Sequence, residues 1–243
     1  MAAKGTIVVL ASLFAMAMSH ACPDDPAPDG VDYPLVLSIP TGCERSQCSF
    51  YVAIRVSDEG QEFLDFKMQG RASGYIAIGF GKQKSRMNDA DVFGCAVNPN
   101  TSMVEAFDTY NLADLSWTNK RDIDTSQVTS RNVCPRPGSL SFVNGAISCA
   151  FSRAVEVFNF TEDKMLNDFF YIQMAYTDAK PVFGSDGLLN LVDHGHNHPT
   201  ITPQSINPFT NQISGSIRSV TFSGCLFVAL ASLALISALV PML

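Results

Sequence analysis

Apolar and polar residues alternate along several short segments of the chain, and this alternation predicts β-strands. Residues 49–56 (SFYVAIRV) place four apolar side chains on one face: Phe50, Val52, Ile54 and Val56. Residues 63–69 (FLDFKMQ) place Leu64, Phe66 and Met68 opposite Asp65, Lys67 and Gln69. Residues 74–81 (GYIAIGFG) are apolar between glycines, which is typical of a strand buried on both faces.

Further strands are expected in four later segments, 91–97, 103–110, 146–153 and 168–176. The strand-like segments are short and separated by turn signals, and the chain has 16 glycines and 13 prolines. This pattern, with little helical periodicity, predicts an all-β fold, an antiparallel immunoglobulin-like β-sandwich over residues 31–204. Before it, residues 22–30 form a Pro/Asp-rich lead-in, and after it the Pro/Ser/Asn-rich residues 205–216 are expected to be a linker.

The first 21 residues have the pattern of a secretory signal peptide. Lys4 precedes an apolar run over residues 7–18, and the small residues Ser19 and Ala21 are placed for cleavage before Cys22. We therefore expect the folded part to enter the secretory pathway.

Residues 217–243 form a second apolar segment. The small residues 214–216, a short spacer and the apolar tail match a signal for a glycosylphosphatidylinositol (GPI) anchor. The alternative is a short C-terminal transmembrane helix. Either interpretation predicts a protein on the outer face of the plasma membrane, or one released from it as a secreted form.

Cysteine usage fits an oxidising compartment. Of seven cysteines, Cys225 lies in the tail, and six remain as disulfide candidates: Cys22, Cys43, Cys48, Cys95, Cys134 and Cys149. The sequence does not choose among the pairings, although Cys43 and Cys48 are close enough to close a local loop. Sequons at Asn100 and Asn159 are two candidate glycosylation sites. The net charge of −7 disfavours a nucleic-acid partner, since phosphate binding needs a basic face.

Residues 74–97 (GYIAIGFGKQKSRMNDADVFGCAV), preceded by residues 38–56 (SIPTGCERSQCSFYVAIRV), resemble the DOMON domain. This β-sandwich occurs in ferric-chelate reductase-like proteins, in dopamine β-hydroxylase relatives and as the cytochrome domain of cellobiose dehydrogenase. The resemblance covers nearly all of residues 35–202. Its most specific part is the glycine-bounded strand, the following segment with Met87, and Asp89-Ala-Asp91 at the entry to the next strand, where we expect the two aspartates to be turn and strand-entry residues.

The resemblance implies a b-type haem. In haem-binding members of the family, iron is held between a methionine in this segment, matched here by Met87, and a histidine near the end of the domain. The stretch DHGHNHPT is similar to the family's histidine-containing stretch, so that His194 matches the second ligand. Thioether and imidazole at the two axial positions leave no open position for a substrate, which indicates electron transfer.

Several alternatives remain open at this stage. His194, His196 and His198 alternate, so that His196 is an alternative axial ligand, or the three bind copper or zinc at the surface, or they bind nothing. Met87 alone is equally well an apolar filler at the edge of the sandwich. The aromatic residues Tyr75, Phe80 and Phe93 flank the segment and are candidate walls of a haem pocket, or plain core.

The sequence contains no nucleophile motif or nucleotide-binding loop, so that an electron-transfer domain is expected rather than a self-contained enzyme. We expect a one-electron carrier at the cell surface, with a role in ferric or cupric reduction. Its partner would be extracellular: a redox protein, a metal chelate or a small reductant such as ascorbate. The alternative is a DOMON module without haem that binds a sugar, a hydrophobic ligand or a protein.

Overall fold

The structure, a computed structural model, describes residues 22–58, 62–84, 89–111, 133–156, 165–183, 189–190 and 200–214. These residues form strands and no helix. The strands of the first half are β1 (Leu35–Ile39), β2 (Phe50–Val56), β3 (Phe63–Gly70), β4 (Tyr75–Gly81), β5 (Asp91–Val97), β6 (Val104–Tyr110) and β7 (Val133–Pro135). Those of the second half are β8 (Ser141–Val143), β9 (Ala146–Ala154), β10 (Tyr171–Thr177), β11 (Val182–Phe183), β12 (Leu189–Asn190), β13 (Thr200–Ile201), β14 (Ile206–Asn207) and β15 (Gln212–Ile213).

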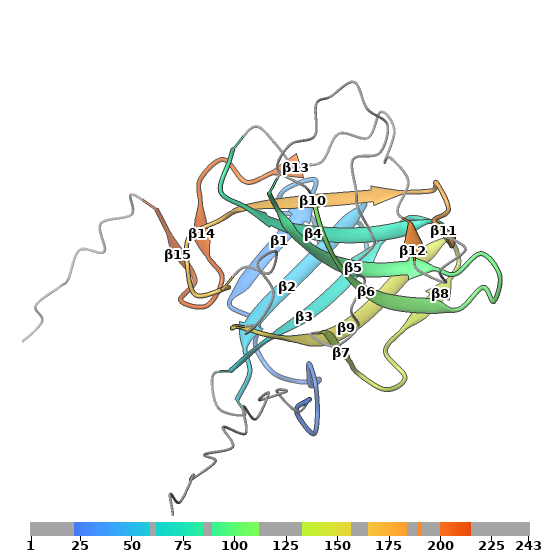
Figure 1. The fold of residues 1–243 in the computed structure, drawn as a ribbon, viewed down its shortest axis with the longest axis horizontal. Coiled ribbons are helices and arrows are strands. Elements are labelled where there is room, and N and C mark those ends of the chain that lie inside the picture. The colour runs from blue at the N-terminus through green and yellow to red at the C-terminus, as the bar shows by residue number, and fades with distance from the viewer. Residues whose placement is uncertain are drawn as a thin grey trace, which may run out of the picture.

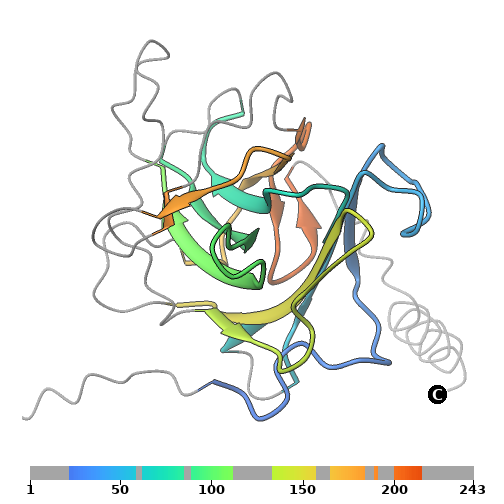
Figure 2. The ribbon, with the colours of Figure 1, turned by 90° about the vertical axis from the view of Figure 1, so that its right-hand side faces the viewer.

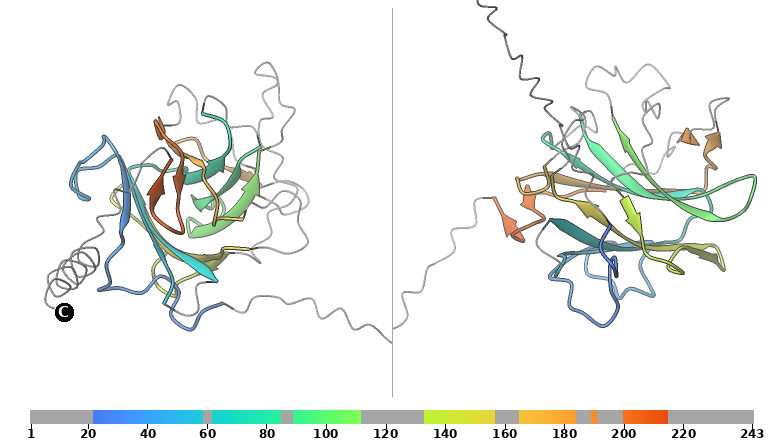
Figure 3. Two further views of the ribbon diagram at one scale, coloured as in Figure 1. Left: turned by 90° about the vertical axis from the view of Figure 1, so that its left-hand side faces the viewer. Right: turned by 60° about the horizontal axis from the view of Figure 1, so that its bottom comes forward.

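Two antiparallel sheets pack face to face, as Figure 1 and the two views in Figure 3 show. The six-stranded sheet has the order β1-β2-β3-β9-β7, with β8 also paired to β9. The five-stranded sheet has the order β13-β10-β4-β5-β6. The predicted all-β antiparallel sandwich is therefore confirmed.

The core between the sheets consists of the apolar faces that the alternation predicts. Phe50, Val52 and Ile54 of β2 are fully buried there, whereas Val56 is half-buried. An aromatic cluster joins the two sheets: Phe66 and Phe151 from the six-stranded sheet, Phe80 and Phe93 from the five-stranded sheet. Burial of these rings stabilises the fold, since each removes a large apolar area from water.

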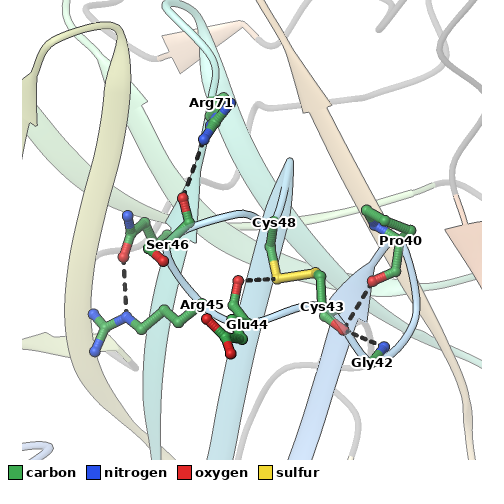
Figure 4. The surroundings of a disulfide bond; sticks show 10 residues. Pro40, Gly42, Cys43, Glu44, Arg45, Ser46, Cys48 and Arg71 are labelled. Atoms are coloured by element: carbon green, nitrogen blue, oxygen red, sulfur yellow. Dashed lines mark hydrogen bonds between the residues drawn. A yellow bond between two sulfur atoms is a disulfide. The ribbon is translucent and has the colours of Figure 1, made fainter.

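Three disulfides use all six candidate cysteines: Cys22–Cys134, Cys43–Cys48 and Cys95–Cys149. Cys95 of β5 and Cys149 of β9 link the two sheets through the core. The local pair Cys43–Cys48, predicted from its spacing, closes the turn between β1 and β2 (Figure 4). Around it, Arg71 donates to the Ser46 carbonyl oxygen at 3.1 Å. Disulfides of this kind fit a protein of the secretory pathway.

The Pro/Asp-rich lead-in has no strand, but it is fixed to the outer face of the six-stranded sheet (Figure 2). Its Ala27 is fully buried, and the Ala27 N–H donates to Ser152 Oγ at 3.1 Å. Asp29 forms ion pairs of 2.6 Å with both Lys67 and Arg136. The prolines and aspartates of the lead-in therefore prevent a regular strand, but they do not prevent its attachment to the six-stranded sheet.

Residues 205–214, which composition predicts as part of a linker, instead form the hairpin β14–β15. Ile206 is buried in the main core and pairs with Phe170 in an isolated bridge. The hairpin ends with Ser214, whose N–H donates to the Ser205 carbonyl oxygen at 2.8 Å. Ile206 and Phe209 pack on the main core, although the polar composition around them is that of a loop.

The two terminal apolar segments, residues 1–21 and 217–243, lie outside the described residues. Within the part of the chain that the structure describes, there is no helix long and apolar enough to cross a bilayer.

Candidate functional site

Met87 itself lies outside the described residues, but the structure shows where its segment leaves and rejoins the fold. The segment follows Gly81 at the end of β4 and returns to Asp91 at the start of β5, and these two strands are hydrogen-bonded neighbours. On the return side, Asp89 has a φ of 57° and its N–H donates to the Asn111 carbonyl oxygen at 2.9 Å. Asn111 in turn donates its N–H to the Ala90 carbonyl oxygen at 2.9 Å, which fixes the end of the segment against β6.

The departing side of the same segment is fixed by a lysine. Lys82 Nζ lies 2.6 Å from Asp168 Oδ2 and 4.0 Å from the centre of the Phe170 ring. Its ammonium group, followed by the backbone N–H of Phe169, lowers the pKa of the Asp168 carboxyl. Both ends of the Met87 segment are therefore attached to neighbouring elements.

The candidate ligands His194 and His196, with His198, also lie outside the described residues. Their segment ends at β13, where Thr200 pairs with Met174 of β10. Strand β10 pairs on its other side with β4, so that one strand separates β13 from the strand that precedes Met87. Two strand spacings amount to about 10 Å. The topology thus brings the flanks of both candidate ligand segments to one sheet.

The outer face of this five-stranded sheet is buried, and small and apolar residues make up most of it. Two rows cross it through hydrogen-bonded partners: Ala175, Ala77, Gly94 and Phe107 in the first, and Gln173, Gly79, Val92 and Thr109 in the second. The rows carry three small residues at their centre, Ala77, Gly79 and Gly94. The six-stranded sheet packs on the opposite face, so that this surface does not belong to the main core.

The glycines of β4 leave room for the side chain of one polar residue, Gln173. A Cβ atom added at Gly81 would come within 2.7 Å of Gln173 Nε2, and one added at Gly79 within 3.3 Å of Gln173 Oε1. The carboxamide therefore lies along β4, over the two glycines, and is almost completely buried. Sequence reasoning missed Gln173, because a glutamine in an apolar strand gives no signal of its own.

The three aromatic residues predicted to line a pocket do not lie on one face. Phe80 and Phe93 point into the core between the sheets, where their rings stack at 5.1 Å. Tyr75 lies on the outer face with Phe107 and Ala77. Residues 75 and 80 are an odd number of positions apart, and side chains of a strand alternate between its faces. Of the three, Tyr75 is on the face described above.

Asp91 does enter β5 as expected, and it also makes a contact that the sequence did not reveal. Arg153 of β9 donates from Nη2 to Asp91 Oδ2, and from Nη1 to the Ala154 carbonyl oxygen at 2.6 Å. The guanidinium carbon also lies 5.5 Å from the centre of the Phe93 ring. The partners are 62 residues apart, and local patterning carries no information about such a pair.

On the outer face, the small residues Ala77 and Gly94 beside the apolar ring of Phe107 suit a planar ring such as haem. Among the described residues there is no group of three histidine, cysteine or acidic side chains placed to hold a metal ion. The proposed surface copper or zinc site at His194, His196 and His198 falls outside them, as does the sequon at Asn159.

A family model for the DOMON domain matches residues 46–177, which is more than half of the 243 residues. The chain belongs to the DOMON family. The matched range runs from the Cys43–Cys48 turn through β10 and includes Met87, whereas His194 follows it. Among curated proteins, none matches the chain.

One solved structure is similar to part of the chain. The cytochrome b domain of pyranose dehydrogenase from Coprinopsis cinerea aligns with a TM-score of 0.41 and 14% sequence identity, over 63% of this chain and 74% of that one.

Proposed function

We propose that this DOMON domain binds haem b and acts as a one-electron carrier at the outer surface of the cell, with Met87 and His194 as axial ligands. The observation that carries the proposal is the buried outer face of the five-stranded sheet, with its row of small residues. Strands of this one sheet flank both segments that hold the candidate ligands.

The residues of the chain have distinct roles in this proposal. The buried residues Ala77 and Gly94, with Phe107 in the same row, would form an apolar surface that excludes water from one side of the site. The pairing of Asp89, Ala90 and Asn111 holds the end of the Met87 segment against β6. Holding the end of a ligand segment would favour electron transfer, because it reduces the rearrangement needed between the two oxidation states.

When bound, haem b supplies one-electron exchange between ferric and ferrous iron. A thioether opposite an imidazole favours the ferrous state, and two protein ligands leave no position for oxygen or a substrate. The domain would therefore pass electrons between extracellular partners, such as ascorbate on one side and a ferric or cupric chelate or a redox protein on the other. A GPI anchor or a terminal helix would keep it at the plasma membrane.

The test is the visible absorption spectrum of the secreted protein, produced with haem available and recorded before and after addition of ascorbate or dithionite. We expect the spectrum of a low-spin, six-coordinate haem. Met87→Ala and His194→Ala should each convert it to a high-spin form or abolish it. Matched controls are Met103→Ala, since Met103 is exposed at the tip of the β5–β6 hairpin, and His198→Ala.

Three other outcomes of the spectral test would change or overturn the proposal. A haem spectrum that is lost in His196→Ala but retained in His194→Ala would identify His196, in place of His194, as the ligand. Metal that a chelator removes from a colourless protein would favour the histidine-bound copper or zinc site. A folded, colourless protein without metal would overturn the proposal and leave a DOMON module that binds a sugar, a hydrophobic ligand or a protein.

A further inference from the structure

Exposed apolar side chains gather at one end of the sandwich, where the tip of the β5–β6 hairpin meets the β7–β8 connection. They surround a groove of about 490 Å³. Its walls include Ser102, Met103 and Val104 on one side and Pro135, Pro137 and Phe142 on the other. Met103 is 66% exposed and Phe142 is 37% exposed. Single exposed apolar residues are ordinary, but a group of them requires an explanation.

The same hairpin tip carries the sequon Asn100-Thr101-Ser102. Asn98 organises the tip: its Oδ1 accepts the N–H groups of Asn100 at 2.8 Å and Thr101 at 3.2 Å, and its Nδ2 donates to Glu105 at 2.7 Å. Asn98 is buried, whereas Asn100 is exposed. Within the described part of the chain, no hydrogen bond holds the carboxamide of Asn100. The tip therefore presents the Asn100 side chain to solvent.

We propose that Asn100 carries an N-linked glycan and that its first sugar residues lie over the apolar groove beside Met103 and Phe142. The donor is an oligosaccharide on a lipid diphosphate. The bond from the sugar C1 to the diphosphate oxygen breaks, the bond from C1 to Asn100 Nδ2 forms, Nδ2 loses one proton and the lipid diphosphate departs. The three disulfides place the chain in the compartment where this transfer occurs.

The position of the sequon favours this occupant. Ser102 is both the hydroxyl residue of the sequon and part of the groove wall. Asn100 and Met103 are three residues apart, a span of at most about 11 Å. A sugar on Asn100 is thus within reach of the groove, and the C–H face of a pyranose ring packs on apolar and aromatic side chains.

The groove is poorly suited to a second copy of the chain. The exposed apolar side chains of Met103 and Phe142 offer at most a few hundred Å² of apolar surface. A stable protein interface buries about 800 Å² on each partner. A covalently attached glycan does not need that area, because its attachment keeps it next to the groove at a high effective concentration.

The experiment uses the full chain secreted from eukaryotic cells. Asn100→Gln should remove one glycan, seen as a loss of mass in the intact protein. Ser102→Gly should remove the same glycan by deleting the hydroxyl, and glycine suits the φ of 58° at this position. Thr101→Ala keeps the sequon and is the matched control, with the glycan expected to remain.

A second measurement tests the position of the sugars. Enzymatic removal of the glycan from the wild-type protein should raise the fluorescence of a dye that binds exposed apolar surface, and Phe142→Ser should suppress that rise. This comparison does not depend on whether an Asn100 variant folds. An unmodified Asn100 in the secreted protein would overturn the proposal, as would deglycosylation at Asn100 without any change in dye binding. Concentration-dependent dimerisation of the glycosylated protein that Phe142→Ser abolishes would also overturn it, in favour of a second copy.

Discussion

Arg153 Nη2 lies 2.5 Å from Asp91 Oδ2, and this ion pair connects the two sheets of the sandwich inside the protein. Neither side chain is more than 1% exposed. Asp91 stands at the point where the Met87 segment rejoins β5, so that the pair ties this segment to β9 of the opposite sheet. A buried guanidinium needs a carboxylate, since its desolvation is otherwise not compensated.

Asp91→Ala should therefore destabilise the fold strongly, by about 3–5 kcal/mol, because it leaves the buried Arg153 charge without its carboxylate. Urea unfolding followed by tryptophan or far-UV signals measures the change. Asp168→Ala is the matched control: it breaks the exposed pair with Lys82 and should cost at most about 1 kcal/mol. Equal losses of unfolding free energy in the two variants would show that the buried Asp91–Arg153 pair contributes no more than an exposed pair.

Gly94 should tolerate no side chain. A Cβ atom at this position would overlap the carbonyl oxygen of Ile76 and the Cα of Ala77 on β4, and backbone atoms of a paired strand cannot move aside. Gly94→Ala should cost about 2 kcal/mol or more, as overpacked sites do. At Gly79, on the same face, an added Cβ meets only side-chain atoms of Gln173 and Val92, at 3.3 Å. Thermal unfolding should thus rank Gly79→Ala as the milder change.

The disulfides should differ in their contribution to stability. Cys95–Cys149 closes a loop with a sequence separation of 54, whereas Cys43–Cys48 spans 5 residues. Loop-closure entropy assigns these bonds about 4 and about 2 kcal/mol. The paired replacement of Cys95 and Cys149 by alanine should lower the unfolding free energy more than that of Cys43 and Cys48 by serine. The opposite order in denaturant unfolding would contradict this reasoning.

Acid should release the lead-in from the sheet. The hydrogen bond from Lys67, followed by that from Arg136, lowers the pKa of Asp29 below its ordinary value of 3.8. A carboxyl with a lowered pKa in the folded state stabilises the fold above the ordinary pKa, and this contribution disappears as the pH falls through the lowered one. Because Asp29 is exposed, its contribution should be at most about 1 kcal/mol.

Hydrogen exchange at the Ala27 N–H measures this release. Asp29→Asn should accelerate exchange near neutral pH, and its difference from the wild type should vanish at about pH 2. Asp32→Asn is the control, since Asp32 is exposed and makes no ion pair with the described residues. A difference that persists in acid would exclude the carboxylate as the cause.

The sequence pattern was sufficient to predict the longer strands, but not short ones such as β7 and β8, nor the contacts between strands. β4 and β5 are buried on both faces and follow from their apolar runs, whereas β2 and β3 lie where the alternation places them, because a half-buried strand imposes a period of two. That pattern assigned Asp65 to a polar face, yet Asp65 is fully buried by the lead-in and accepts hydrogen bonds from Arg55 and Ser152. Such networks depend on distant segments, and a local pattern contains no information about them.

The two candidate ligands of the site, Met87 and His194, stay predictions, since both lie outside the described residues. The resemblance indicated Met87 and His194, and the topology places the flanks of their segments on one sheet. The sequence grouped Tyr75, Phe80 and Phe93 as candidate pocket walls. In the structure, Phe80 and Phe93 lie in the core between the sheets and Tyr75 lies on the outer face, because successive side chains of a strand point to opposite faces. The row of small residues on the outer face can be recognised only when the paired strands are aligned in register, because these residues come from separate segments.

The outer face of the five-stranded sheet should be sensitive to added bulk in a way that other buried surfaces are not. Ala77→Leu would place a branched side chain at the centre of this face, where the proposed haem needs a flat surface. Ala150→Leu is the matched control: Ala150 is a buried alanine on the outer face of the six-stranded sheet, next to Lys67. Under the proposed function, Ala77→Leu should lower the ratio of haem to protein in the secreted material, whereas Ala150→Leu should not. Far-UV circular dichroism of both variants separates loss of haem from loss of fold. If both folded variants retained full haem content, the haem site would have to lie elsewhere than on this face.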